Sequence, residues 1–203
     1  MLSQQSILGT IIIRRYYLQL IDIGGEKNRI DLGKWKSMDI RPTAEYRIDL
    51  DTFKYFPVKE VDAYYISHTL EHFTPDRIEK ILRECYRTLK PGGKIRIVVP
   101  NIRVGIDWYL KESDKLFDKK APTKPENYPD TLLGYLISWF ITPDKEKVNG
   151  HKTAFDWETL SYYLLDVGFD SIVKKEYNIC SEEFIGKDIE RYKDFSLYVE
   201  VQK

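Results

Sequence analysis

The stretch "VDAYYISHTLEHFTPDRIEKILRECYRTLKPGGKIRIVVPN" (residues 61–101) reads as a strand, a helix and a second strand in immediate succession. Residues 61–67 are apolar enough for a buried strand, and in residues 75–90 apolar side chains recur at intervals of three and four, as on one face of a helix. The Pro-Gly-Gly at 91–93 predicts the end of that helix, and residues 94–100 read as another buried strand. This order favours parallel strands joined by a helical crossover.

The rest of the chain continues the alternation of strands and helices. Further strand-like runs occupy residues 16–23, 35–39, 45–50, 170–179 and 195–203. The run "DWETLSYYLLDVGF" predicts a helix that Asp156 caps at its start and that Gly168 ends. We therefore expect an α/β layered fold with a mostly parallel sheet.

Composition describes a soluble globular protein of ordinary domain size. The 203 residues carry 32 basic and 32 acidic side chains, so the chain lacks the basic surplus that nonspecific binding to nucleic acid or anionic membranes requires. Cys85 and Cys180 lie far apart and in no CxxC pair, which suggests neither a disulfide framework nor a structural zinc site. We expect a reducing, cytoplasmic setting.

We expect a single domain over residues 1–203, because no internal repeat or low-complexity tract divides the chain. The apolar run 7–13 is short, is interrupted by Gly-Thr, and is followed rather than preceded by two arginines, so we expect it to be neither a secretory signal nor a membrane span. Residues 1–15 are interpreted as an N-terminal extension or a linker from an upstream domain. The polar, proline-containing residues 111–130 predict a long loop or an insertion.

Ligands of open parallel sheets bind beyond the carboxyl ends of the strands. That rule directs attention to the residues at or just after the end of each predicted strand. They are Gly24, Gly25, Asp39, Asp49, Leu50, Asp51, Ser67, His68, Pro100 and Asn101. A ligand site is therefore predicted at this edge.

Two of the three histidines, His68 and His72, stand with Glu71 directly after the strand 61–67, and the third, His151, lies far along the sequence. A helix is expected to begin at Thr69, so that His68 and His72, one turn apart, share a face. If the segment around His151 meets them in space, the histidines make a site. The zincin order His-Glu-x-x-His is not present, so no metal site is predicted.

Four segments in order, "VDAYYISHTLEH", "ILRECYRTLKPGGKIRIVVPN", "GHKTAFDWETLSYYLLDVGF" and "SLYVEVQK", resemble class I S-adenosylmethionine-dependent methyltransferases of the small type associated with sugar and polysaccharide biosynthesis. The resemblance covers residues 17–203. It implies a Rossmann-like three-layer sandwich with a seven-stranded, mostly parallel sheet whose last strand is antiparallel. It also implies that residues 101–150 form an acceptor-side insertion.

The resemblance implies that the turn after the first strand cradles the methionine end of S-adenosylmethionine. The family pattern is acid, apolar, Gly, any residue, Gly, and it matches Asp22, Ile23 and Gly24 here. Glu26 stands where the second glycine is usual, and Gly25 beside it supplies backbone freedom. We expect this loop to hold the cofactor. A degenerate loop in a non-catalytic binding domain is the alternative.

The same resemblance assigns the remaining cofactor contacts. Asp39, with Ile40 beside it, has the spacing of an acidic residue that binds the ribose hydroxyls. Asp49, Leu50 and Asp51 match the segment that lies along the adenine, with the register between the two aspartates left open. Ser67 and His68 stand next to the expected position of the methyl group.

Methyl transfer to a hydroxyl requires a group that removes the hydroxyl proton, and histidine titrates near neutral pH. His68 is the first candidate for this base and His151 the second, while His72 is expected to pack or cap. Glu71 or Asp107 could orient an imidazole.

The resemblance implies O-methylation of a sugar hydroxyl, such as that of a deoxyhexose in a glycan or its precursor, with S-adenosylhomocysteine as product. Glycosyltransferases, fused or associated, are the implied partners, and no nucleic acid is expected. Fifteen tyrosines, nine phenylalanines and four tryptophans supply core and, in the minority, acceptor-pocket side chains. A small-molecule or nitrogen acceptor is the alternative within the enzyme class.

Overall fold

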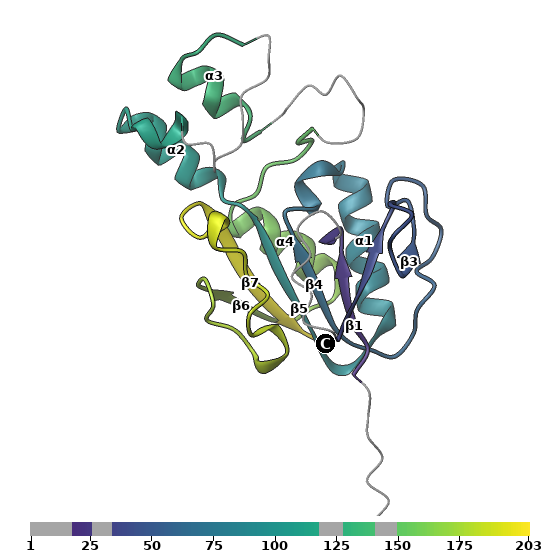
Figure 1. Cartoon of the computed structure of the whole chain (residues 1–203). Coiled ribbons are helices and arrows are strands. Elements are labelled where there is room, and N and C mark those ends of the chain that lie inside the picture. The colour runs from purple at the N-terminus through teal and green to yellow at the C-terminus, as the bar shows by residue number, and fades with distance from the viewer. Residues whose placement is uncertain (1–17, 26–33, 118–127, 141–149) are drawn as a thin grey trace, which may run out of the picture.

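The computed structural model describes residues 18–25, 34–117, 128–140 and 150–203, and it shows one sheet with helices against it (Figure 1). The seven strands lie in the order β3-β2-β1-β4-β5-β7-β6. Their bounds are β1 Leu20–Ile23, β2 Trp35–Asp39, β3 Tyr46–Arg47, β4 Val61–Ser67, β5 Leu89–Pro100, β6 Ser171–Lys175 and β7 Ser196–Gln202. Neighbours pair in parallel except at β7, which is antiparallel to both β5 and β6. The expected fold is confirmed.

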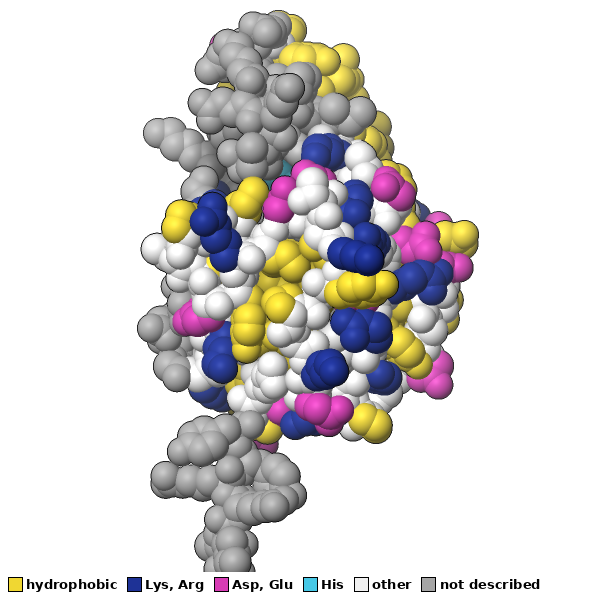
Figure 2. Space-filling view, turned by 90° about the vertical axis from the view of Figure 1, so that its right-hand side faces the viewer, with side chains coloured by type: hydrophobic (Ala, Val, Ile, Leu, Met, Phe, Trp, Pro, Cys, Tyr) yellow, Lys and Arg dark blue, Asp and Glu magenta, His cyan; other side chains and the backbone are white. Residues whose placement is uncertain are grey.

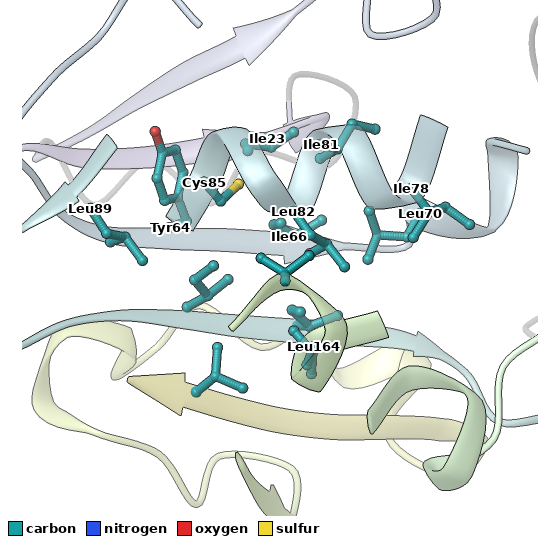
Figure 3. Packing of buried hydrophobic residues seen from close by; sticks show 14 of the residues in the cluster. Ile23, Tyr64, Ile66, Leu70, Ile78, Ile81, Leu82, Cys85, Leu89 and Leu164 are labelled. Carbon is teal, nitrogen blue, oxygen red and sulfur yellow. The ribbon is translucent and has the colours of Figure 1, made fainter. Parts of the chain in front are cut away.

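Helices α1 (Pro75–Thr88) and α4 (Trp157–Val167) cover one face of the sheet. Figure 3 shows apolar side chains of α1 and α4 meeting those of the strands, among them Ile66 and Leu164. The limits of α4 are as expected: the Asp156 carboxylate accepts a hydrogen bond from Thr159 N at 2.9 Å. Gly168 follows with φ at 113°, a backbone conformation that favours glycine.

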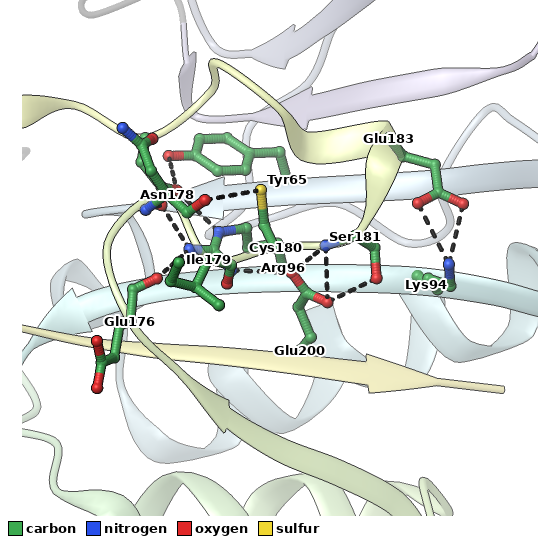
Figure 4. A network of polar contacts seen from close by, with 11 residues as sticks. Tyr65, Lys94, Arg96, Glu176, Asn178, Ile179, Cys180, Ser181, Glu183 and Glu200 are labelled. Atoms are coloured by element: carbon green, nitrogen blue, oxygen red, sulfur yellow. Dashed lines mark hydrogen bonds and ion pairs between the residues drawn. The ribbon is translucent and has the colours of Figure 1, made fainter.

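The segment 176–195, which joins β6 to β7, covers the opposite face of the sheet (Figure 4). It contains two short 3-10 turns, η4 (Glu182–Phe184) and η5 (Glu190–Tyr192). Its Phe184 is fully buried and packs against Trp35 of β2, with ring centroids 5.9 Å apart. The third layer, within the described residues, is therefore this segment rather than a row of long helices.

Several predicted limits were wrong. The strand β5 begins at Leu89, because Val61 pairs with Leu89 and Ala63 pairs with Lys94, and the Pro-Gly-Gly forms the irregularity between those pairs. The last turn before α1 is a 3-10 turn, η2 (Leu70–His72), rather than the start of the helix. β3 and β6 are shorter than predicted, and of the predicted strand 16–23 residues 20–23 form β1, with 16–17 outside the described residues.

Beyond the carboxyl ends of the parallel strands stand α2 (Ile102–Leu110), η3 (Asp114–Phe117) and α3 (Leu132–Ile137), the described part of the predicted insertion (Figure 1). They enclose a small core of their own with Tyr192 and Phe195. Trp108 and Trp139 are core residues there, with their rings 5.7 Å apart. This part of the chain therefore overhangs the edge at which ligands are expected.

The surface in Figure 2 carries basic side chains spread among acidic and apolar ones. This mixture on the face shown agrees with the balanced charge of the chain. None of the helices within the described ranges has the length and apolar character needed to cross a bilayer.

Candidate functional site

The turn after β1 is built from two glycines that have no room for a side chain. Gly24 has φ at 74°, and a Cβ there would lie 2.4 Å from Thr69 Oγ1. A Cβ on Gly25 would lie 2.3 Å from the Asp22 carboxylate. The turn therefore needs both glycines, for conformation at Gly24 and for space at each. Glu26 lies outside the described residues.

Asp22 is buried and forms an ion pair with Lys187, which comes from the segment 176–195. The Lys187 ammonium also lies over the rings of Trp35 and Tyr65, 5.0 and 4.8 Å from their centroids. Lys187 was not predicted, because it lies outside every motif and reaches Asp22 only through the fold. The Ile23 side chain is buried in the core, so Ile23 can offer the cofactor only its backbone.

Asp39 is the last residue of β2, at the predicted edge, and its carboxylate accepts hydrogen bonds from Arg41 N at 2.9 Å and from Arg41 Nη1 at 2.8 Å. The Arg41 side chain is 41% exposed, so it can swing aside. Ile40 is 47% exposed beside them. A ribose diol would take the place of Arg41 on this carboxylate.

The two aspartates of the segment 49–51 have different surroundings. The Asp49 carboxylate accepts hydrogen bonds from Asp51 N and Thr52 Oγ1, each at 2.9 Å, and so closes a local turn. Asp51 is exposed and lies 3.5 Å from Lys152 Nζ. The Leu50 side chain is buried. Asp51 is therefore the aspartate whose carboxylate faces another segment of the site.

The two histidine-containing segments meet in space. Lys152 N donates a hydrogen bond to Glu71 O at 2.7 Å, and Thr153 Oγ1 donates one to Phe73 O at 2.8 Å. The rings of His72 and His151 come to 5.1 Å. We call His68, Glu71, His72 and His151 the histidine cluster. It lies where β4 ends, at the edge that parallel-sheet geometry predicts for ligands.

His68 is held on three sides. Its Nδ1 lies 3.4 Å from Glu71 Oε1, and its Nε2 lies 2.9 Å from Ser196 Oγ at the start of β7. Its ring stacks on Tyr192, with centroids 3.6 Å apart and planes 18° apart. Backbone φ is 48°, an uncommon value for a histidine. Ser196 and Tyr192 carry no sequence signal that could have predicted this contact.

Glu71 is the charged centre of the histidine cluster. Its side chain is 2% exposed, and burial alone would raise the pKa of its carboxyl group. The hydrogen bond from His68 and the charges of His68, His72 and His151 outweigh burial and lower this pKa to about 2. Burial lowers the pKa of His151 to about 4, against the opposing effect of Glu71. At neutral pH, then, Glu71 is an anion and His151 is neutral.

Of the two carboxylates that could orient an imidazole, the structure selects Glu71. The Asp107 side chain is 53% exposed and pairs with Lys111 at 2.8 Å on α2.

Ser67 stands directly before His68. The backbone N–H of His68 donates a hydrogen bond to Val98 O at 2.8 Å, so β4 and β5 together fix the backbone turn at His68.

A separate hollow of about 500 Å³ is lined by residues 55–59 and Arg87. It lies by the C-terminal end of α1 and the segment that enters β4, so it is at the amino end of the strands. It includes none of the predicted site residues.

Comparison with known proteins agrees with this architecture. Residues 31–97 match the family model described as a methyltransferase domain. Among solved structures, an S-adenosylmethionine-dependent methyltransferase from Mesorhizobium loti matches with TM-score 0.55 and 16% identity over 92% of this chain and 91% of that one. One from Methanosarcina mazei matches with TM-score 0.53 and 18% identity over 92% and 94%. No curated protein matches the sequence significantly.

A third solved structure, the 1,6-didemethyltoxoflavin-N1-methyltransferase of Burkholderia thailandensis, contains S-adenosylhomocysteine. It matches with TM-score 0.51 and 11% identity over 91% of this chain and 70% of that one. At such low identities, structural similarity shows the fold alone. The match to the methyltransferase-domain model is independent of it, because that match is made on the sequence. Together they support the expected enzyme class: residues 31–97 match a methyltransferase-domain model, and the chain has the fold of S-adenosylmethionine-dependent methyltransferases, a class whose cofactor is S-adenosylmethionine.

Proposed function

We propose that the protein transfers the methyl group of S-adenosylmethionine to a hydroxyl of a sugar, such as a deoxyhexose in a glycan or its precursor. The observation that carries the proposal is the histidine cluster: all three histidines of the chain surround one buried carboxylate beside the turn that would hold the cofactor. Such a cluster supplies what a hydroxyl acceptor needs and a nitrogen acceptor does not.

His68 acts as the general base in this proposal, with Glu71 orienting its ring. A proton on Nδ1 faces the Glu71 carboxylate at 3.4 Å, which leaves the lone pair of Nε2 for the Ser196 hydroxyl at 2.9 Å. The acceptor hydroxyl gives its proton to Ser196 Oγ as the proton of Ser196 moves to Nε2. The acceptor oxygen forms its bond to the methyl carbon, and the sulfonium leaves as the neutral thioether S-adenosylhomocysteine. His151 remains the second candidate for the base.

In the proposed cofactor site the turn at Gly24 and Gly25 holds the methionine end, with Asp22 and Ile23 before it. Asp39 and Ile40 contact the ribose, Asp49, Leu50 and Asp51 lie along the adenine, and Ser67 and His68 border the methyl group. The narrow turn supports this placement, because a backbone without side chains permits close approach of a ligand.

The sugar assignment rests on the resemblance of the four segments and on the aromatic side chains of the insertion. Phe117, Tyr128 and Phe140 are each at least 36% exposed and could face the C–H surfaces of a sugar ring. The proposal retains a fused or associated glycosyltransferase as partner. It retains the cytoplasm as location, since Cys85 and Cys180 are free thiols.

Calorimetric titration with S-adenosylhomocysteine tests the cofactor site. We expect micromolar binding to the wild type and at least about tenfold weaker binding to Gly24→Ala, because the new methyl group collides with Thr69. Gly92→Ala is the matched control, since Gly92 has a similar φ of 77° but its Cβ would meet only the Gln202 side chain at 3.7 Å. Equal affinity in both variants would disprove the proposed turn, and no binding to the wild type would favour a non-catalytic domain.

Methyl transfer from labelled S-adenosylmethionine to methyl glycosides of hexoses and 6-deoxyhexoses tests the acceptor, with small amines as the competing class. We expect a hydroxyl acceptor, with His68→Gln lowering kcat by about 10²- to 10⁴-fold. Ser196→Ala is expected to lower kcat as well, while affinity for S-adenosylhomocysteine stays unchanged. Transfer to an amine that survives both substitutions would refute the proposal.

A further inference from the structure

Glu71, His72 and His151 present three ligand atoms that all lie within 4.8 Å of one another. Of these atoms, His72 Nε2 and Glu71 Oε1 lie 4.0 Å apart. The Glu71 side chain is 2% exposed, and the ring of His72 is 28% exposed. One carboxylate and two imidazoles thus converge on a partly enclosed point.

The hydrogen bonds around these side chains leave their lone pairs facing one another. His72 Nδ1 lies 3.4 Å from Gly150 O, which accepts its proton and leaves the lone pair of Nε2 toward Glu71. Apart from the His68 contact, neither oxygen of Glu71 accepts a hydrogen bond from the part of the chain that the structure describes. His151 Nδ1 is buried and likewise has no partner there. Acceptors that face each other without a donor are costly in a protein interior.

We propose that Glu71, His72 and His151 bind a divalent first-row transition cation, with Zn²⁺ as its test ion. A cation satisfies all three acceptors at once, which a proton shared between two of them does not. Two imidazoles and one carboxylate suit zinc, manganese, iron, cobalt or nickel, whereas magnesium and calcium prefer oxygen ligands. At metal–ligand distances of about 2.1 Å, tetrahedral ligand atoms lie roughly 3.4 Å apart. The three side chains would therefore close by about 1 Å through small torsional changes.

The surroundings of the ligands resemble those of metal sites in general. Metal-binding histidines commonly donate their second ring N–H to a backbone carbonyl or a carboxylate. His72 does so toward Gly150. The backbone bond between Lys152 and Glu71 holds the two ligand segments together without any ion. The scaffold is thus formed before the cation binds.

The role of the cation rests on the proposed function. Three protein ligands leave coordination positions open, and oxygen atoms of the acceptor can occupy them. A cation there lowers the pKa of a bound hydroxyl and orients it toward the methyl group. Vicinal hydroxyls, as sugars carry, can bind through two oxygens. The inferred substrate class is therefore an acceptor with a second hydroxyl beside the one that is methylated.

The first test is calorimetric titration of the chelator-treated full chain with ZnCl₂, without cofactor or acceptor. We expect one ion per chain, and at least about tenfold weaker binding in each of Glu71→Gln, His72→Gln and His151→Gln. CoCl₂ should give visible absorption bands of a histidine-ligated site in the wild type only. Glu183→Gln is the matched control, since that carboxylate is exposed to a similar extent as His72 and pairs with Lys94.

Retention of the single strong site in a His72→Gln and His151→Gln double variant would overturn the proposal, as would the lack of a defined stoichiometry in the wild type. Thermal unfolding and S-adenosylhomocysteine affinity show whether each variant is folded. If Glu71→Gln does not fold, His72→Gln decides, because its partly exposed ring can be replaced with little strain. Intact cofactor binding without Zn²⁺ binding refutes the cation site alone, whereas Zn²⁺ binding without transfer to any hydroxyl refutes the proposed function alone.

Discussion

Of the groups of buried polar side chains on this sheet, two are built in contrasting ways. One is the histidine cluster at the end of β4. The other, which we call the Arg96 cluster, consists of Arg96 on β5, Asp188 in the segment 176–195 and Glu200 on β7 (Figure 4). Both contain buried charge, but of the two only the Arg96 cluster gives every N–H group of its cation an acceptor.

Every N–H group of the Arg96 guanidinium has an acceptor. Nε and Nη2 donate to the Asp188 carboxylate, Nη1 donates to Glu200 Oε1 at 2.9 Å, and the carbonyls of Glu176 and Ile179 take the remaining two at 3.0 and 3.3 Å. Burial alone lowers the pKa of Arg96, but these partners raise it above the ordinary value. Such a cluster fixes the segment 176–195 onto the sheet and has no capacity left for a ligand.

The histidine cluster, in contrast, keeps acceptors that no described donor satisfies. Buried polar groups that are fully hydrogen-bonded, as in the Arg96 cluster, indicate a structural role. Buried acceptors left without donors at the ligand edge of the sheet, as in the histidine cluster, indicate a functional one. Substitutions in the Arg96 cluster should therefore affect stability, and substitutions in the histidine cluster should affect binding and activity.

The largest loss of stability is expected for Arg96→Met. The substitution leaves Asp188 and Glu200 buried without their cation, which costs about 5 kcal/mol in the free energy of unfolding. Urea denaturation followed by circular dichroism measures it. The control is Arg83→Met, because Arg83 is 49% exposed and its pairs with Glu79 and Asp166 lie on the surface, where the loss of an ion pair changes stability little. Equal losses of unfolding free energy in the two variants would contradict a structural role for the Arg96 cluster.

A smaller loss is expected for Lys187→Met, which removes the ammonium group that pairs with the buried Asp22. We expect a loss of about 3 kcal/mol. Asp22→Asn in the same chain should restore much of it, giving a coupling of about 2 kcal/mol in a double-mutant cycle. Additive effects of the two substitutions would show that the pair does not hold the segment 176–195 onto β1.

The sequence predicts the parts of the molecule that depend on local pattern. The spacing of apolar residues in α1, the N-cap at Asp156 and the glycine at 168 follow from periodicity and capping, and the structure confirms them. The carboxyl ends of β1, β2, β4 and β5, and with them the edge that carries His68, follow from the alternation of strands and helices. Strand limits that depend on pairing with a neighbouring strand, such as the start of β5, could not be predicted from the sequence of that strand alone.

The residues of the candidate site could be chosen from the sequence, but their assembly in space could not. His68, Glu71 and His151 were chosen by residue type and by their place after strands, and the structure brings them together. Their partners Ser196 and Tyr192 come from the far end of the chain, where nothing in the local sequence distinguishes them. The zincin motif requires both histidines on one helix. A search for that motif therefore misses the set Glu71, His72 and His151, because its members lie on two separate segments.

The smallest effect on stability is expected for His72→Gln. The His72 ring is 28% exposed, and its hydrogen bond to Gly150 is long at 3.4 Å, so with a chelator present the free energy of unfolding should change by less than about 0.5 kcal/mol. Zinc in hundredfold excess over its dissociation constant should stabilise the wild type by about 2.7 kcal/mol, because it binds the folded chain, and the variant far less. Thermal unfolding with and without ZnCl₂ measures both. A large loss for His72→Gln in chelator would mean that His72 supports the fold as Arg96 does, and the distinction between the two clusters would fail.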